Sequence, residues 1–198
     1  MWGQLLGTAP KEAEFGRHAV VPGSPYKVWR NTNLGKSRRS QLDCKTRRLS
    51  DRGNVRLQVL PPDEAGEALI WAKETRTGRF PGDAIQREYI KNFYSEIART
   101  GAATGYARTY KLTCGEDTVA TCFGVVDGER YCYLVLACDY ENFAQYSPGM
   151  LILDLAVADW AATGGKVFDF TIGDEPFKST FGCTRSPMYI FETDIVRR

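Results

Sequence analysis

The chain has 198 residues, of which 43% are hydrophobic and 25% are charged, and its formal net charge is +2. These values fit one globular domain and exclude a fibrous or intrinsically disordered chain. The apolar stretches at 131–138 and 150–157 are much shorter than the roughly 20 residues that span a bilayer, which excludes a transmembrane helix. Residues 1–7 lack the basic start and long apolar segment of a secretory signal, so we expect a cytoplasmic protein.

The chain contains six cysteines but only one histidine, His18, and no Cys-x-x-Cys pair. Most of the cysteines lie within regular apolar patterns, so we expect reduced core thiols and neither disulfides nor a metal site. The cysteines are Cys44, Cys114, Cys122, Cys132, Cys138 and Cys183.

Residues 1–33 contain Gly and Pro without a regular period, which predicts an extended N-terminal lead-in before one domain over 34–198. Between Lys27 and Arg56 there are ten Lys or Arg residues but only two acidic ones. This basic block is either a solvated helix face or an arm that meets phosphate-rich substrate, nucleic acid or acidic membrane headgroups.

Three helices and one strand are predicted in the first half of the domain. We expect a helix over 34–52, a strand over 55–60, and a helix over 63–77 that Asp63 can cap. A further helix should run from Asp83 to Gly101 with four apolar residues spaced by four, which we expect in the core. These residues are Ile85, Tyr89, Phe93 and Ile97.

After Gly105 the hydrophobic period changes to two, which predicts three antiparallel strands over 106–112, 119–126 and 131–138. Asp127-Gly128 is a favoured dipeptide for the tight turn between the second and third strands.

The C-terminal segments alternate between helix and strand, with a helix over 148–162, a strand over 167–172, a short helix over 175–180 and a strand over 188–193. A strand, helix, strand sequence implies a right-handed crossover with parallel pairing. We therefore predict an α/β (α+β) fold whose mixed, mostly antiparallel sheet is flanked by helices.

The helix expected at 148 starts on Ser147-Pro148-Gly149. The first turn of a helix presents unpaired N–H groups and the positive end of its dipole, which together can bind an anion. Pro148 suits the first turn, Gly149 leaves the backbone open, and the hydroxyl of Ser147 can cap the helix or bind a phosphate oxygen. A plain helix cap explains the same three residues.

The order of meander, helix start and parallel strand is that of the GNAT N-acyltransferases, in which this loop holds the coenzyme A pyrophosphate. The stretch 139–153, then Phe168-Asp-Phe170 and 173–178, resembles the cellulose-biosynthesis-associated CelD/BcsL proteins. That family is a GNAT branch related to the Fem-type aminoacyl transferases. Residues 24–26 and the basic stretch 35–49 are also similar to the family's central segment.

The resemblance implies a GNAT acyl-CoA N-acyltransferase fold and the C-terminal one of two GNAT-like halves. It implies transfer of an acyl group, expected to be acetyl, from acetyl-CoA or another acyl-CoA to a small-molecule or peptide amine. The donor-binding residues would be Tyr146, Ser147, Pro148, Gly149 and Met150.

Five residues are candidates for catalysis. Asp139 and Asp174 are the first choices for the base, with Glu175 next to Asp174. Asp139 can instead be a solvated loop residue, and Asp174 and Glu175 can instead cap and begin the helix before Pro176. Lys178 can meet donor phosphate or an acceptor carboxylate, and Tyr146 can protonate the departing thiolate or form a wall.

Asp169 alternates to the opposite face from its neighbours Phe168 and Phe170, and a buried carboxylate needs a cationic partner. Lys178 or Arg108 can provide it.

Two other functions stay open. The basic block supports a Fem-like transferase that takes its donor from tRNA, since clustered arginines bind phosphate backbones. Alternatively, the chain is an inactive GNAT-fold binding module, which can form a homodimer that replaces the missing half.

Overall fold

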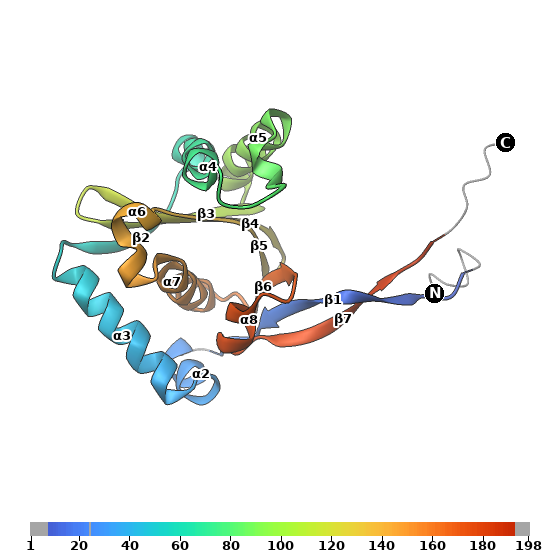
Figure 1. Ribbon diagram of the computed structural model, residues 1–198, viewed down its shortest axis with the longest axis horizontal. Coiled ribbons are helices and arrows are strands. Elements are labelled where there is room, and N and C mark those ends of the chain that lie inside the picture. The colour runs from blue at the N-terminus through green and yellow to red at the C-terminus, as the bar shows by residue number, and fades with distance from the viewer. Residues whose placement is uncertain (1–7, 24, 193–198) are drawn as a thin grey trace.

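The computed structural model describes residues 8–23 and 25–192. Its centre is a seven-stranded sheet in the order β2-β3-β4-β5-β6-β1-β7 (Figure 1). The strands are β1 (Lys11–Val20), β2 (Val55–Val59), β3 (Ala107–Cys114), β4 (Asp117–Asp127), β5 (Arg130–Cys138), β6 (Val167–Ile172) and β7 (Thr184–Ile190).

Helices cover both faces of the sheet, with α4 and α5 on one face and α2, α3, α7 and α8 on the other (Figure 1). No helix in the described ranges has both the length and the apolar character that a membrane span requires. The helices are α2 (Tyr26–Asn33), α3 (Lys36–Ser50), α4 (Pro62–Arg76), α5 (Glu88–Thr104), α6 (Tyr140–Phe143), α7 (Pro148–Ala162) and α8 (Pro176–Thr180), with 3-10 turns η1 (Ala84–Gln86) and η2 (Ala144–Tyr146).

The predicted mixed sheet is confirmed. The strands β3, β4 and β5 form the antiparallel meander, and Gly128 in its second turn has a φ of 57°, which glycine adopts without a steric penalty. The strand β6 pairs in parallel with β5 and antiparallel with β1.

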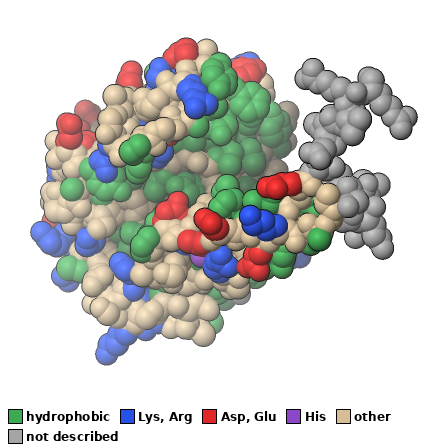
Figure 2. Space-filling model, turned by 45° about the vertical axis from the view of Figure 1, so that its right-hand side comes forward, with side chains coloured by type: hydrophobic (Ala, Val, Ile, Leu, Met, Phe, Trp, Pro, Cys, Tyr) green, Lys and Arg blue, Asp and Glu red, His purple; other side chains and the backbone are tan. Residues whose placement is uncertain are grey.

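The N-terminal segment differs from the predicted lead-in, because β1 lies inside the sheet between β6 and β7, and α2 follows it. Gly16, His18 and Val20 alternate as buried residues in β1, but only Val20 is strongly apolar. A pairing irregularity between Glu12 and Gly16 also interrupts the period. The strand therefore carries no clear apolar signal. Figure 2 shows acidic and basic side chains interspersed along the arm that β1 and β7 form.

The predicted apolar stripe of α5 is wrong in part. Ile85 is buried, but Tyr89 and Phe93 are 66% and 60% exposed. Small residues bring α5 close to β3 instead: a Cβ atom on Gly101 would overlap the Cβ atom of Ala107. Ile97, as predicted, and Tyr94 pack against the core on this side of the helix. The buried face of α5 is therefore rotated away from Tyr89 and Phe93.

Three of the six cysteines are buried and Cys132 and Cys183 are half-buried, but Cys44 is exposed on α3, against the prediction of core thiols throughout. All six are free thiols.

Candidate functional site

The site forms where β5 and β6 separate. The two strands pair only from Arg130 to Cys132 on β5, although β5 continues to Cys138. In the pairing of β4 with β5, Gly124 faces Tyr133 and Phe123 faces Val135, which leaves Leu134 as an extra residue. Such a bulge bends its strand, and bulges are common beside active sites. Beyond Cys132, the edge of β5 is free of β6.

A cavity of about 470 Å³ lies against this free edge. Its walls come from β5, the first turns of α7, the β6–α8 connection, and the segment between α4 and α5. The lining residues are Arg76, Arg79, Phe80, Asp83, Tyr133, Leu136, Cys138, Tyr140, Gly149, Met150, Leu153, Glu175 and Phe177.

The start of α7 differs from the predicted side-chain cap. Ser147 has left-handed backbone angles, φ 53° and ψ 58°, and its side chain caps no helical N–H. Its hydroxyl accepts a hydrogen bond from Lys45 Nζ instead. The amides of Met150 and Leu151 both donate to the Ser147 carbonyl, at 3.0 and 3.2 Å. The short helices α6 and η2 also separate β5 from α7, in a stretch for which the sequence predicted no helix.

Of the five predicted donor-binding residues, Gly149 and Met150 line the cavity. A Cβ atom on Gly149 would lie 3.2 Å from Tyr140 Oη and 3.3 Å from Leu136 Cδ2, so glycine permits close packing here. Pro148 is buried, and Tyr146 packs against the core beside Phe143, with ring centroids 6.3 Å apart.

Asp139 is occupied as a helix cap. Its Oδ1 accepts from the backbone N–H of Asn142 at 3.0 Å and its Oδ2 from Asn142 Nδ2 at 2.8 Å. It lines an adjoining cavity of about 450 Å³ with Glu141 and Arg79. Asp139 therefore caps α6, a role that was not predicted, and both of its carboxylate oxygens accept hydrogen bonds there.

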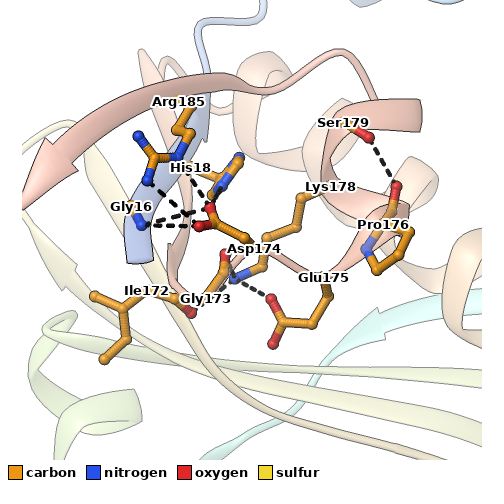
Figure 3. A network of polar contacts seen from close by, with 10 residues as sticks. All are labelled: Gly16, His18, Ile172, Gly173, Asp174, Glu175, Pro176, Lys178, Ser179 and Arg185. Atoms are coloured by element: carbon orange, nitrogen blue, oxygen red, sulfur yellow. Dashed lines mark hydrogen bonds and ion pairs between the residues drawn. The ribbon is translucent and has the colours of Figure 1, made fainter. Parts of the chain in front are cut away.

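Asp174 joins three segments of the chain (Figure 3). Its Oδ1 lies 2.6 Å from His18 Nε2 and accepts from Arg185 Nε at 3.1 Å, while Oδ2 accepts from the Gly16 amide at 3.3 Å. Hydrogen bonds from Arg185 and then His18 lower the pKa of Asp174 to about 2. A carboxylate with so low a pKa is a poor proton acceptor at neutral pH.

Glu175 is the predicted base candidate that lines the main cavity. Its side chain is 54% exposed, and its Oε2 lies 2.9 Å from Lys178 Nζ. Lys178 is buried and also donates to the carbonyls of Ile172 and Gly173, at 2.8 and 3.1 Å (Figure 3). The three N–H groups of an ammonium are thus all engaged, which leaves Lys178 no free donor for a phosphate.

The predicted partners of Asp169 are wrong, although its burial is confirmed. Asp169 Oδ2 accepts from Arg130 Nη1 at 2.7 Å, and its Oδ1 accepts from the Thr171 amide at 2.8 Å. Arg17 approaches the same carboxylate at 3.7 Å, whereas Arg108 pairs with Asp159.

The segment between α4 and α5 was missed from the sequence. Arg76 Nε donates to Asp83 Oδ2 at 2.8 Å, and its Nη1 donates to the Leu136 carbonyl at 2.5 Å. Arg79 places its guanidinium 3.9 Å from the ring centroid of Tyr140. The turn-forming run Gly78-Arg79-Phe80-Pro81-Gly82, with an arginine and an aromatic at its centre, is the signal that could have identified it.

Burial raises the pKa of Tyr140 and of Cys138 to about 12 each. Both cavity groups are therefore protonated at neutral pH. They can donate hydrogen bonds to a ligand but do not act as bases.

A mixed sheet that splays beside a helix start, over a cavity, is the architecture of the GNAT acyltransferases. In agreement, the family model described as an acetyltransferase (GNAT) domain matches residues 36–179. The chain belongs to this family. No curated protein sequence matches the chain significantly.

Three solved structures share the fold. A conserved protein of unknown function from Bacteroides thetaiotaomicron VPI-5482 has 15% sequence identity to this chain and a TM-score of 0.61. FemX has 12% sequence identity and a TM-score of 0.60. The C-terminal domain (DUF2156) of a candidate lysylphosphatidylglycerol synthetase from Agrobacterium fabrum has 12% sequence identity and a TM-score of 0.52. The alignments cover 91%, 89% and 91% of this chain but only 60% of each of those chains. This chain therefore spans about three fifths of the length of these structures.

Proposed function

We propose that the chain transfers an acyl group from an acyl-coenzyme A, first of all acetyl-CoA, to the amine of a small molecule or peptide. The observation that carries the proposal is the cavity of about 470 Å³ that joins the free edge of β5 to the first turn of α7. The proposal also places the chain in the CelD/BcsL branch of the family, where it would correspond to the C-terminal one of two GNAT-like halves.

The donor would lie along β5. The extended pantetheine arm can pair with the backbone of β5 between Tyr133 and Cys138, where β6 no longer does. Its diphosphate would then meet the first turn of α7 at Gly149, because the amide of Met150 already donates to the Ser147 carbonyl. The helix dipole favours an anion at this position. The same turn would be supported on the side away from the cavity by Tyr146, Ser147 and Pro148.

Glu175 is the base that this arrangement favours. It is a half-exposed carboxylate at the cavity wall, whereas Asp139 caps α6 and Asp174 is held by Arg185 and His18. Glu175 would take a proton from the attacking ammonium or amine, directly or through a water molecule. Lys178 would hold the carboxylate in place rather than touch the donor.

The reaction would form a C–N bond to the thioester carbonyl and break its C–S bond. The thiolate of coenzyme A leaves and takes up a proton, and backbone N–H groups near the bulge at Leu134 can stabilise the oxyanion.

Binding of coenzyme A tests the proposal. At about 100 times its dissociation constant, a ligand stabilises a fold by about 2.7 kcal/mol, which thermal unfolding detects. We expect stabilisation by coenzyme A and acetyl-CoA, and its loss in Gly149→Val, where Tyr140 and Leu136 already crowd the added side chain. Gly35→Val is the control, because no atom lies within 4 Å of a Cβ there. Stabilisation that survives Gly149→Val would contradict the assigned donor site.

One surface favours a second candidate, a transferase that takes an aminoacyl group from tRNA. The exposed face of α3 carries an open cavity of about 490 Å³ lined by Lys36, Arg39, Arg47 and three other residues. Several cations on one helix face suit a phosphate backbone. Salt-sensitive binding of tRNA without any binding of coenzyme A would favour this candidate. Binding of neither ligand would favour an inactive module, and sedimentation would show whether that module dimerises.

A further inference from the structure

Arg79 lines the proposed donor site, although it is far in sequence from the first turn of α7. It lies on the turn that follows α4, and its guanidinium stacks 3.9 Å from the ring centroid of Tyr140. The hydroxyl of Tyr140 lies 3.2 Å from the position of a Cβ atom on Gly149. A chain of contacts thus connects the α4–α5 turn to the first turn of α7, across the cavity that all three residues line.

Among the charged side chains that line the cavity, Arg79 is the cation without an acidic partner in the described residues. Arg76 is paired with Asp83 at 2.8 Å, and Glu175 is paired with the buried Lys178 at 2.9 Å. Among residues 8–23 and 25–192, no carboxylate lies within ion-pair distance of the Arg79 guanidinium, and no acceptor receives a hydrogen bond from it. This group is therefore free to bind an anion.

Stacking prepares the guanidinium for that role. A guanidinium held over an aromatic face gains about 0.5–1 kcal/mol at an exposed site and keeps its N–H groups pointing outward in one plane. A phosphate accepts two such N–H groups at once. The adjoining cavity carries the carboxylates of Glu74, Asp139 and Glu141, which repel an anion. The favourable side for a phosphate is thus the side of the main cavity.

We propose that Arg79 binds the diphosphate of the donor, opposite the first turn of α7 at Gly149. This inference rests on the proposed acyl-CoA function and adds a second wall, from the α4–α5 turn, to the donor site. The segment between α4 and α5 would then favour donors that carry a diphosphate over those that lack one.

Calorimetric titrations of the full chain test the assignment with coenzyme A, dephospho-coenzyme A, which keeps the diphosphate, and pantetheine, which lacks it. We expect Arg79→Gln to weaken coenzyme A and dephospho-coenzyme A about tenfold and to leave pantetheine unchanged. Arg79→Lys should recover part of the loss. Arg99→Gln is the matched control, because Arg99 pairs with Glu96 on α5 and lines none of the described cavities.

The outcomes distinguish failure of the Arg79 assignment from failure of the proposed acyl-CoA function. If wild type binds coenzyme A and Arg79→Gln binds it equally well, Arg79 has no such role while the acyl-CoA function stands. A loss confined to coenzyme A would point to the 3′-phosphate and overturn the diphosphate assignment. An equal loss for pantetheine would make Arg79 a structural residue. If wild type binds none of the three ligands, the proposed function itself fails.

Discussion

Lys178 and Glu175 form an ion pair in which the ammonium is buried and the carboxylate half-exposed, with Nζ 2.9 Å from Oε2. The same ammonium donates to the carbonyls of Ile172 and Gly173, at the turn that follows β6. A lysine side chain thus closes the connection that places Glu175 at the cavity.

Lys178→Met should destabilise the fold by about 2–6 kcal/mol, because two carbonyls lose their donor and each costs about 1–3 kcal/mol when left unpaired. Denaturant unfolding measures this. Lys166→Met removes an exposed lysine paired with Glu129 and should change the free energy of unfolding by less than about 1 kcal/mol. Equal effects of the two substitutions would contradict a structural role for Lys178.

Asp174 should make the stability depend on acid pH. Its pKa is lowered from 3.8 to about 2, chiefly by the hydrogen bond from Arg185, so the folded chain binds the proton less readily than the unfolded chain. The stability that the carboxylate contributes is present above pH 3.8 and is lost as the pH falls through about 2. Thermal melting of wild type and Asp174→Asn should therefore differ at pH 6 and converge towards pH 2. A difference that is constant with pH would rule out this linkage.

Gly165→Ala should destabilise the junction between α7 and β6. A Cβ atom on Gly165 would overlap the indole of Trp160, which is anchored by a 2.9 Å hydrogen bond from its Nε1 to the Val167 carbonyl. Overpacking of this kind costs about 1–3 kcal/mol, as urea unfolding would show. Gly35→Ala adds the same methyl group in open space and should be nearly neutral. An unchanged midpoint for Gly165→Ala would mean that the indole moves without penalty.

Thiol labelling of the native protein should show one fast cysteine. Cys44 is exposed on α3, while burial raises the pKa of Cys122 and Cys138 to about 12 each and keeps these thiols protonated. Since the thiolate is the reactive form, Ellman's reagent should react first at Cys44. The substitution Cys44→Ser should remove the fast phase, and a fast phase that persists would show that another thiol is accessible.

Local patterns were sufficient for much of the fold. The period-two runs of β3 to β5, the Asp-Gly turn at Gly128 and the apolar α7 were predicted, because each depends on residues close together in sequence. β1 escaped detection because its buried positions include Gly16 and His18, which carry little apolar signal. The predicted stripe on α5 was wrong at Tyr89 and Phe93, because the helix buries Ala98 and Gly101. Ile97 and Tyr94 pack beside these small residues.

Only part of the candidate site could be predicted from the sequence. Gly149, Met150 and Glu175 line the cavity as expected, but Arg76, Arg79 and Asp83 join them from a segment far earlier in the chain. The roles of Asp139, Asp174 and Lys178 are set by Asn142, Arg185, His18 and backbone carbonyls, and no local pattern identifies such partners.

The sequence by itself determined the order of the longer helices and strands from β2 onward, though not α6, and also the mixed sheet and the family resemblance, because hydrophobic period and turn residues act over short stretches. Only the tertiary structure decided where β5 and β6 part, which carboxylate faces the cavity and which cation remains free. Those features depend on side chains from distant segments competing for the same hydrogen bonds and ion pairs, and that competition is settled only when the chain has packed.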